Sequence, residues 1–197
     1  DRQTTAMSRP VSGAKAVLPH SIPSGKPIEH GDVVIHGTGC LVDAYYSEDE
    51  RTMFVGPPAA GQERLFEVMR RAQQAAIDAI RPGAVCREID RAARSVIEEA
   101  GYGRHFTHRT GHGLGTDIHE PIPQIASNVD DLLQPGMTFT IEPGIYLPGV
   151  GGVQHRGEEP RDLRGQPAGR EPLLCHIARC LAGADRYHPD PQSPTVT

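Results

Sequence analysis

The sequence contains no tryptophan and few aromatic residues, it has no run of basic side chains, and its formal net charge is −5. Nucleic-acid-binding proteins gather Lys and Arg, often with aromatics, to contact phosphates and bases, so we expect no nucleic-acid partner. The sequence also lacks an apolar run long enough to cross a bilayer and shows no signal-peptide pattern. We therefore expect no membrane partner.

Cysteine is scarce as well. The four cysteines stand at Cys40, Cys86, Cys175 and Cys180. The last two are separated by four residues, which is not the CxxC spacing of a structural zinc site, and no partner pair accompanies them. We therefore predict a reducing, cytoplasmic location. The 197 residues are enough for one domain with a sizeable core.

The segment from 108 to 144 carries the strongest functional signal. Glycines flank His112, so the backbone can turn sharply there and come close to a ligand. Imidazoles and carboxylates bind borderline metals and transfer protons. A single histidine is usually an ordinary residue, whereas this cluster within a glycine frame indicates a functional site. Its members are His108, His112, His119, Glu120 and Glu142.

Hydrophobic periodicity predicts two helices, at about 62–80 and 86–100. Arg81-Pro82-Gly83 ends the first, and Gly101 stands at the C-cap position of the second. The predicted strands cover 32–36, about 41–46, 52–55 and 137–146.

Several motifs resemble those of the pita-bread metallopeptidases, the family of methionine aminopeptidase, aminopeptidase P, prolidase and creatinase. They follow one another in unbroken order over roughly residues 11–155 and include Leu18-Pro-His20, Tyr46-Ser-Glu48-Asp-Glu50-Arg-Thr, His108-Arg-Thr-Gly-His112-Gly-Leu-Gly and Glu142-Pro-Gly144. The resemblance implies an α+β pita-bread fold: a curved, mainly antiparallel sheet with flanking helices, here truncated at the N-terminus.

The resemblance also divides the chain into two parts. We predict a partial catalytic domain at 11–155. Residues 156–197 form a tail punctuated by proline and glycine, without strand periodicity and out of register with the family. We predict that this tail is disordered and arose from a shifted reading frame or a fusion.

The family's peptidases hold two metal ions with five ligands, and this sequence retains only part of the set. Glu48, His112 and Glu142 fall on ligand positions. Gly37 and Arg156 fall on the other two and cannot ligate. The resemblance therefore implies at most one weakly bound divalent ion (Mn, Co or Zn), or none, with Asp43 or Asp49 as substitute ligands.

The proton-handling positions are better preserved. His20, His108 and His119 match family residues that contact substrate and donate protons or hydrogen bonds. The string around Glu50 is similar to that of creatinase, which works without metal. That similarity implies that Glu50 and Glu142 clamp a cationic substrate and that His20 is the general base. The alternative for Glu50 is a surface salt bridge to Arg51 or Arg70.

Three functional hypotheses follow from these residues. The first is an Xaa-Pro peptidase-like hydrolase that cleaves peptide or amide C–N bonds, with a short peptide or small amide as substrate. The second is a metal-independent, creatinase-like hydrolase of a small amine or amidino compound. The third is a non-catalytic, truncated remnant. Relatives of this kind are commonly dimers, so a homodimer is expected.

Overall fold

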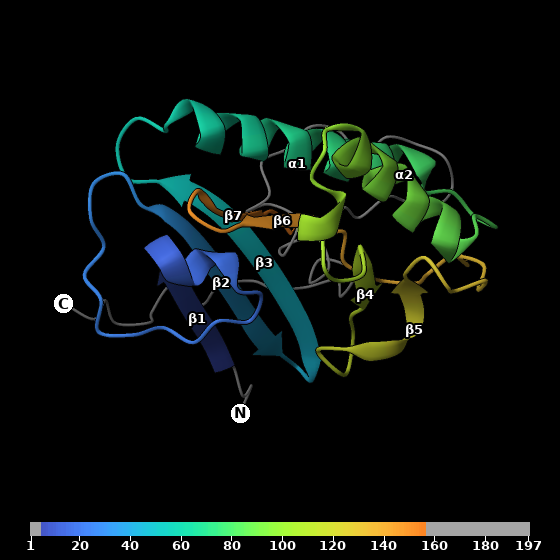
Figure 1. Cartoon of the computed structure of the whole chain (residues 1–197). Helices are drawn as coiled ribbons and strands as arrows, with labels where there is room; N and C mark the ends of the chain where they lie inside the picture. Colours follow the sequence, from blue (N-terminus) through green and yellow to red (C-terminus); the bar gives the residue numbers. More distant parts are fainter. Residues whose placement is uncertain (1–4, 157–197) are drawn as a thin grey trace, which may run out of the picture.

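The computed structural model describes residues 5–156. Two helices lie over a layer of antiparallel strands (Figure 1). The tail prediction for 156–197 falls outside the described residues, except for Arg156. The elements are β1 (Thr5–Ser12), β2 (Val33–Val42), β3 (Tyr45–Phe54), α1 (Ala60–Ala79), α2 (Cys86–Glu99), β4 (Gly111–Gly113), β5 (Glu120–Ile125), β6 (Gly144–Leu147) and β7 (Gly151–Gln154), with short 3-10 turns at Gly13–Val17 and Gly103–His105.

Both predicted helices are confirmed, to within about two residues at each end. At the start of α1, the Ala59 N–H donates to Gln62 Oε1 at 2.9 Å, which satisfies one of the free amides of the first turn. At the end of α2, Gly101 has a φ of 86°, a left-handed conformation that glycine adopts without steric cost. The predicted C-cap glycine is therefore confirmed.

The first sheet pairs β1, β2 and β3 in that order, all antiparallel. A strand was predicted across 41–46, and this is wrong, because the chain reverses there. Asp43 and Ala44, with φ of 50° and 69°, form a two-residue hairpin turn. The turn lacks the glycine that usually marks such a hairpin, so no local signal predicts it.

The predicted strand at 137–146 is also only partly correct. The assigned strand, β6, begins at Gly144 and pairs with β7. The residues before it run beside β4 and exchange backbone hydrogen bonds with it: Thr140 N–H donates to His112 O at 2.8 Å, and Glu142 N–H to Thr110 O at 2.7 Å. Pro143 has no N–H to continue this pairing, and the strands change partners there.

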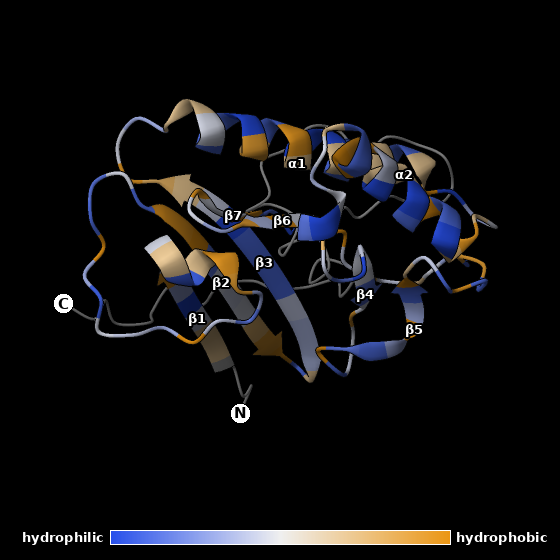
Figure 2. Cartoon of the chain, in the orientation of Figure 1, coloured by the Kyte–Doolittle hydropathy of each residue, from blue (hydrophilic) through white to orange (hydrophobic). Residues whose placement is uncertain are grey.

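The core lies between the helices and the strands. The inner face of α1 packs against β6 and β7, and that of α2 packs against β5. Ile141, in the segment before β6, belongs to the same apolar cluster. The largest side chains fully buried there are Leu65, Met69, Ile89, Ile97, Ile125, Leu133, Ile141 and Ile145. Figure 2 shows a contrast: β3, at the centre of the view, is largely hydrophilic. No helix within residues 5–156 is long and apolar enough to span a membrane.

Candidate active site

A cavity of about 350 Å³ brings together residues that are far apart in the sequence. Every predicted catalytic residue lies on its wall. The lining residues are Arg9, Pro19, His20, Glu50, His108, Arg109, His112, His119, Ala126, Glu142, Tyr146, Gln154 and Arg156. A larger hollow of about 560 Å³ lies between α1 and α2, but it is lined by charged and aliphatic side chains and contains no histidine.

Strand β3 supplies two carboxylates to this region. Glu48 and Glu50 are two residues apart, so they project from the same face of the strand. Glu50 lies directly opposite Gly37 on β2. A Cβ at position 37 would lie 3.0 Å from Glu50 Oε1. Glu50 thus occupies the space next to position 37, where the resemblance places a metal ligand, and the glycine there leaves room for it.

The interpretation of Glu50 as a surface residue paired with Arg51 or Arg70 is wrong. Glu50 is only 5% exposed. Its carboxylate lies 3.7 Å from Arg156 Nη2 and 3.9 Å from Arg9 Nη2.

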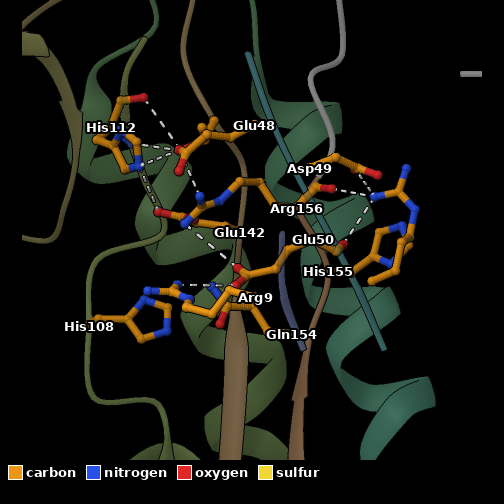
Figure 3. Close-up of polar contacts among 12 residues, drawn as sticks. Arg9, Glu48, Asp49, Glu50, His108, His112, Glu142, Gln154, His155 and Arg156 are labelled. Carbon is orange, nitrogen blue, oxygen red and sulfur yellow. Dashed lines mark hydrogen bonds and ion pairs between the residues drawn. The ribbon is translucent and has the colours of Figure 1, made fainter. Parts of the chain in front are cut away.

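Arg156 stands at the centre of the acidic cluster, as Figure 3 shows. Its backbone follows β7 and forms an isolated antiparallel bridge with Glu50, in which Arg156 N–H donates to Glu50 O at 3.0 Å. Its guanidinium is 2.7 Å from Glu48 Oε2 and also pairs with Glu142. One buried cation therefore faces three buried or half-buried carboxylates, and this residue of the predicted tail is part of the site.

His112 is held in one tautomer. Its Nδ1 lies 2.9 Å from Gly113 O, and a carbonyl can only accept, so we assign the proton to Nδ1. The lone pair of Nε2 then points to Glu142 Oε1 at 3.3 Å and Glu48 Oε2 at 3.6 Å. Within the described residues, Nε2 has no hydrogen-bond partner. This is the orientation of an imidazole that ligates a metal.

Burial and charge shift the pKa values of these groups. Burial raises the pKa of Glu142 to about 7, although Arg156 acts in the opposite direction. Burial lowers the pKa of His112 to about 4, so its ring is neutral at pH 7. Burial also works against the charge of Arg156, yet its ion pairs with Glu142, Glu50 and Glu48 raise the pKa of the guanidinium. Arg156 therefore stays a cation.

The other three histidines of the site also have lowered pKa values, which favours the neutral ring. Burial lowers the pKa of His108 to about 4, and its Nε2 lies 3.0 Å from the Tyr146 hydroxyl. The His119 ring packs on His112, with centroids 4.2 Å apart, and burial lowers its pKa too. Burial, then the charge of Arg9, lowers the pKa of His20.

His20 has an unusual backbone conformation. Its φ is 59°, in the left-handed region that residues other than glycine rarely adopt. Such strain persists only where surrounding structure enforces it, and it clusters at functional sites. The loop after Gly13–Val17 therefore holds this imidazole at the cavity edge.

The glycines that flank His112 serve backbone packing. A Cβ on Gly111 would lie 1.9 Å from Thr140 O, and one on Gly113 would lie 2.6 Å from Ile122 O. The expected close approach is real, but the neighbour is another stretch of backbone and not a ligand. This contact brings the segment that carries His112 against the one that carries Glu142.

Sequence reasoning missed the helical residues that position the site. Asp90 on α2 is fully buried and accepts hydrogen bonds from Arg94 and from the Thr110 N–H and hydroxyl. Arg94 in turn donates to Phe106 O and His108 O. This network ties α2 to the histidine-bearing segment. The available signal was an aspartate four residues before an arginine on a predicted helix.

Gln73 on α1 makes a second link. Its amide donates to Ile141 O at 3.2 Å and to His155 O at 3.1 Å. These carbonyls belong to the residues immediately before Glu142 and Arg156. One helical side chain therefore sets the spacing between the two residues.

The residues present do not fit the family's two-ion centre. Among residues 5–156, no group of three or more His, Cys, Asp or Glu side chains is arranged to hold an ion. The substitute ligands we expected do not line the cavity: Asp43 lies in the hairpin turn, and Asp49 pairs with Arg51. The cation among the carboxylates is the Arg156 guanidinium.

The antiparallel strands, the helices over them and a cavity of histidines and carboxylates define the class of the pita-bread metallopeptidases. The model of metallopeptidase family M24 matches residues 9–157. The chain belongs to this family, and the predicted α+β pita-bread fold is confirmed.

Individual relatives agree with this assignment. The Xaa-Pro dipeptidase of Pyrococcus furiosus is 44% identical over 143 residues, which are 73% of this chain and 41% of that protein. The Xaa-Pro dipeptidase of Lactobacillus delbrueckii subsp. lactis is 44% identical and is covered to 39%. The solved structure of the prolidase from Pyrococcus furiosus has a TM-score of 0.74 at 42% identity, covering 77% of this chain and 44% of that one. The chain thus spans about two fifths of the curated relatives it matches.

Proposed function

We propose that this chain is the catalytic portion of a hydrolase of the Xaa-Pro dipeptidase type, which cleaves a peptide or amide C–N bond. The observation that carries the proposal is the convergence of His20, His108 and His119 on one cavity with Glu142. A cavity of about 350 Å³ is large enough for a short peptide. The similarity to Xaa-Pro dipeptidases supports this substrate class.

The chain's own residues can carry the proton transfers. His20, with its pKa lowered, is neutral near pH 7 and can take a proton from an attacking water. His119 on the cavity wall can donate a hydrogen bond to the developing oxyanion. His108 is engaged by Tyr146, so it holds that hydroxyl in place. Because the residues do not fit a pair of ions, no step of this mechanism passes through a metal.

A second candidate is the metal-independent, creatinase-like hydrolase. Arg156 favours it, because this residue supplies a cation among the carboxylates without any ion. The same ion pairs argue against one part of that hypothesis. Glu50 and Glu142 are already paired with Arg156, so their charge is not free to clamp a cationic substrate.

Turnover by matched histidine variants tests both candidates. The substrates are a Gly-Pro-type dipeptide and small amidino or N-acyl amines, each with and without chelator. His20→Ala should lower kcat by about 10²–10⁴-fold, the usual loss for a general base. The control is His36→Ala, whose side chain bonds Ser8 outside the cavity.

The outcomes separate the hypotheses. Loss of activity in His112→Ala together with chelator sensitivity would support a metal hydroxide and contradict the base role of His20. Full resistance to chelator would exclude the metallopeptidase mechanism. A wild-type chain that unfolds cooperatively but turns over no substrate would overturn the proposal in favour of a non-catalytic remnant.

Three finer proposals remain. A cytoplasmic location rests on the small number and the spacing of the cysteines in the sequence. A homodimer, and Mn, Co or Zn as the ion if one binds, rest on the resemblance alone. Light scattering of the purified protein tests the dimer. Elemental analysis of the same sample tests the ion.

A further inference from the structure

We propose that residue 156 alone decides whether this cavity holds a guanidinium or a divalent metal ion. In this chain the guanidinium of Arg156 takes the place of the ion. The side chains around it form a metal site that lacks one anionic ligand, the one that residue 156 would supply. The proposal concerns binding only and stands whether or not the chain is catalytic.

The first step concerns the donors. Gly37 removes one family carboxylate, but the Glu50 carboxylate fills the adjoining space, 3.0 Å from where a Cβ at 37 would lie. The facing position on β3 therefore supplies a carboxylate beside position 37 of β2. With Glu48 on the same strand face and Glu142 across the cavity, three anionic donors remain, as hard and borderline divalent ions require.

The second step concerns His112. This side chain is 1% exposed, and its Nε2 has no hydrogen-bond partner among the described residues. The Nδ1–H bond to Gly113 O fixes the ring so that the Nε2 lone pair faces Glu48 and Glu142. The buried Nε2 lone pair faces two carboxylates, and no described side chain places a proton or a cation between them to offset the repulsion. The ring is thus pre-oriented for an ion that Arg156 displaces.

The third step concerns charge. Arg156 is the cation in contact with Glu48, Glu50 and Glu142, and it is buried. Among the described carboxylates Arg9 pairs only with Glu50, at 3.9 Å, and its side chain is 42% exposed, so it compensates little. Without Arg156 the carboxylates would be an uncompensated anionic cluster in a desolvated place. A divalent cation is the partner that such a cluster would attract.

The fourth step concerns the backbone at residue 156. The main chain there is fixed by two hydrogen bonds to Glu50, of 3.0 and 3.3 Å. The direction of its Cβ is therefore set by the strand pairing and not by the guanidinium. A glutamate at this position would project into the same cluster and complete a set of four carboxylates and one imidazole.

The test is direct metal binding by the full-length chain. Co²⁺, Mn²⁺ and Zn²⁺ are titrated by calorimetry, with visible absorbance as a second readout for Co²⁺, into the wild type and Arg156→Glu. The wild type should show no saturable site. The variant should bind one ion per chain, with an affinity roughly 100-fold or more above any binding by the wild type. The reason is that the substitution makes the charge beside the ion more negative by two units in a partly desolvated site.

Two controls locate the site. Arg71→Glu makes the same change in net charge on the exposed face of α1, and it should bind no better than the wild type. Adding His112→Ala to Arg156→Glu should abolish the gained site together with its cobalt spectrum. A gain that survives the loss of His112 would overturn the proposal.

The neutral variant Arg156→Gln keeps the proposal testable if the glutamate variant does not fold. It should melt at a lower temperature than the wild type, and added divalent ions should raise its melting temperature but not that of the wild type. Absence of metal stabilisation in a folded variant would contradict the proposal. So would His112-dependent binding of a metal ion by the wild type.

Discussion

The two layers of this molecule bury side chains in opposite ways. Between α1 and the strands, burial is apolar: Leu65, Met69 and Ile97 are each 0% exposed. Around β3 and the end of β7, burial is ionic: Glu50, Glu142 and Arg156 are 4–6% exposed. Figure 3 shows the ionic cluster.

The two layers respond differently to substitution and to pH. An apolar core responds to the volume that a substitution removes and is indifferent to pH. A buried ionic cluster depends on each partner, because removing one leaves an uncompensated charge. The ionic layer should therefore show losses that depend on pH, and the apolar layer should not. Four experiments sharpen or break this comparison.

The largest loss is expected for Arg156→Met. Removing the shared cation should cost about 3–5 kcal/mol at pH 8. Its carboxylates would then have pKa values above those of the unfolded chain, as Glu142 already has at about 7. A raised carboxyl pKa makes stability increase as pH falls through that value, so the deficit should shrink between pH 8 and 5. Urea unfolding at both pH values measures it, and a constant deficit would contradict the ionic account.

Leu65→Ala is the apolar counterpart. Leu65 is fully buried in α1, so its replacement should lower the free energy of unfolding by about 3 kcal/mol, through lost apolar burial and the cavity left behind. The loss should be the same at pH 8 and pH 5, because the side chain touches no titrating group in its apolar cluster. The same urea series provides the test. A pH-dependent loss would show that the two layers are not separable.

His108 provides a smaller effect, which comes from a pKa shifted downward, whereas that of Glu142 is shifted upward. Its pKa in the folded state, about 4, lies below the ordinary histidine value of 6.5, so the folded state resists protonation. Its contribution to stability is therefore full above pH 6.5 and is lost as pH falls from 6.5 to about 4. The advantage of wild type over His108→Gln should shrink by up to about 3 kcal/mol across that window. An advantage that grows on acidification would contradict the shift.

The smallest effect is expected for Gly37→Ala. The added Cβ would lie 3.0 Å from Glu50 Oε1, so the carboxylate must shift within the ionic cluster. The cost should be about 1 kcal/mol, typical of mild overpacking. Gly25→Ala is the control, since a Cβ there meets nothing within 4 Å. Equal stability of the two variants would mean that Glu50 does not depend on the space at 37.

Much of the apolar layer could be predicted from the sequence, because helical periodicity and the stop at Arg81-Pro82 are local signals. The histidine cluster and its relation to Glu142 could be predicted as well, through resemblance. The hairpin turn at Asp43-Ala44 could not, because these residues lack the glycine that usually marks such a turn.

Most contacts of the ionic layer could not be predicted from the sequence, because they depend on strand register and on segments far apart in the chain. The fit between Glu50 and Gly37 requires the β2–β3 pairing to be known. Arg156 was assigned to the tail because the residues after it lose strand periodicity. Gln73 could not be predicted either, because nothing in the sequence distinguishes it from other polar helix residues; its role depends on the two carbonyls to which it donates.

The bridge between Glu50 and Arg156 has a consequence for the order of folding. It joins parts of the chain about a hundred residues apart, as does the neighbouring contact of Arg51 with the Arg156 carbonyl. Such long loops close slowly, whereas the α1–α2 hairpin depends on neighbouring residues and forms early. The helices should therefore be structured in the rate-limiting transition state while the cavity is still open. Substitutions at Arg156 should then speed unfolding and leave the folding rate nearly unchanged.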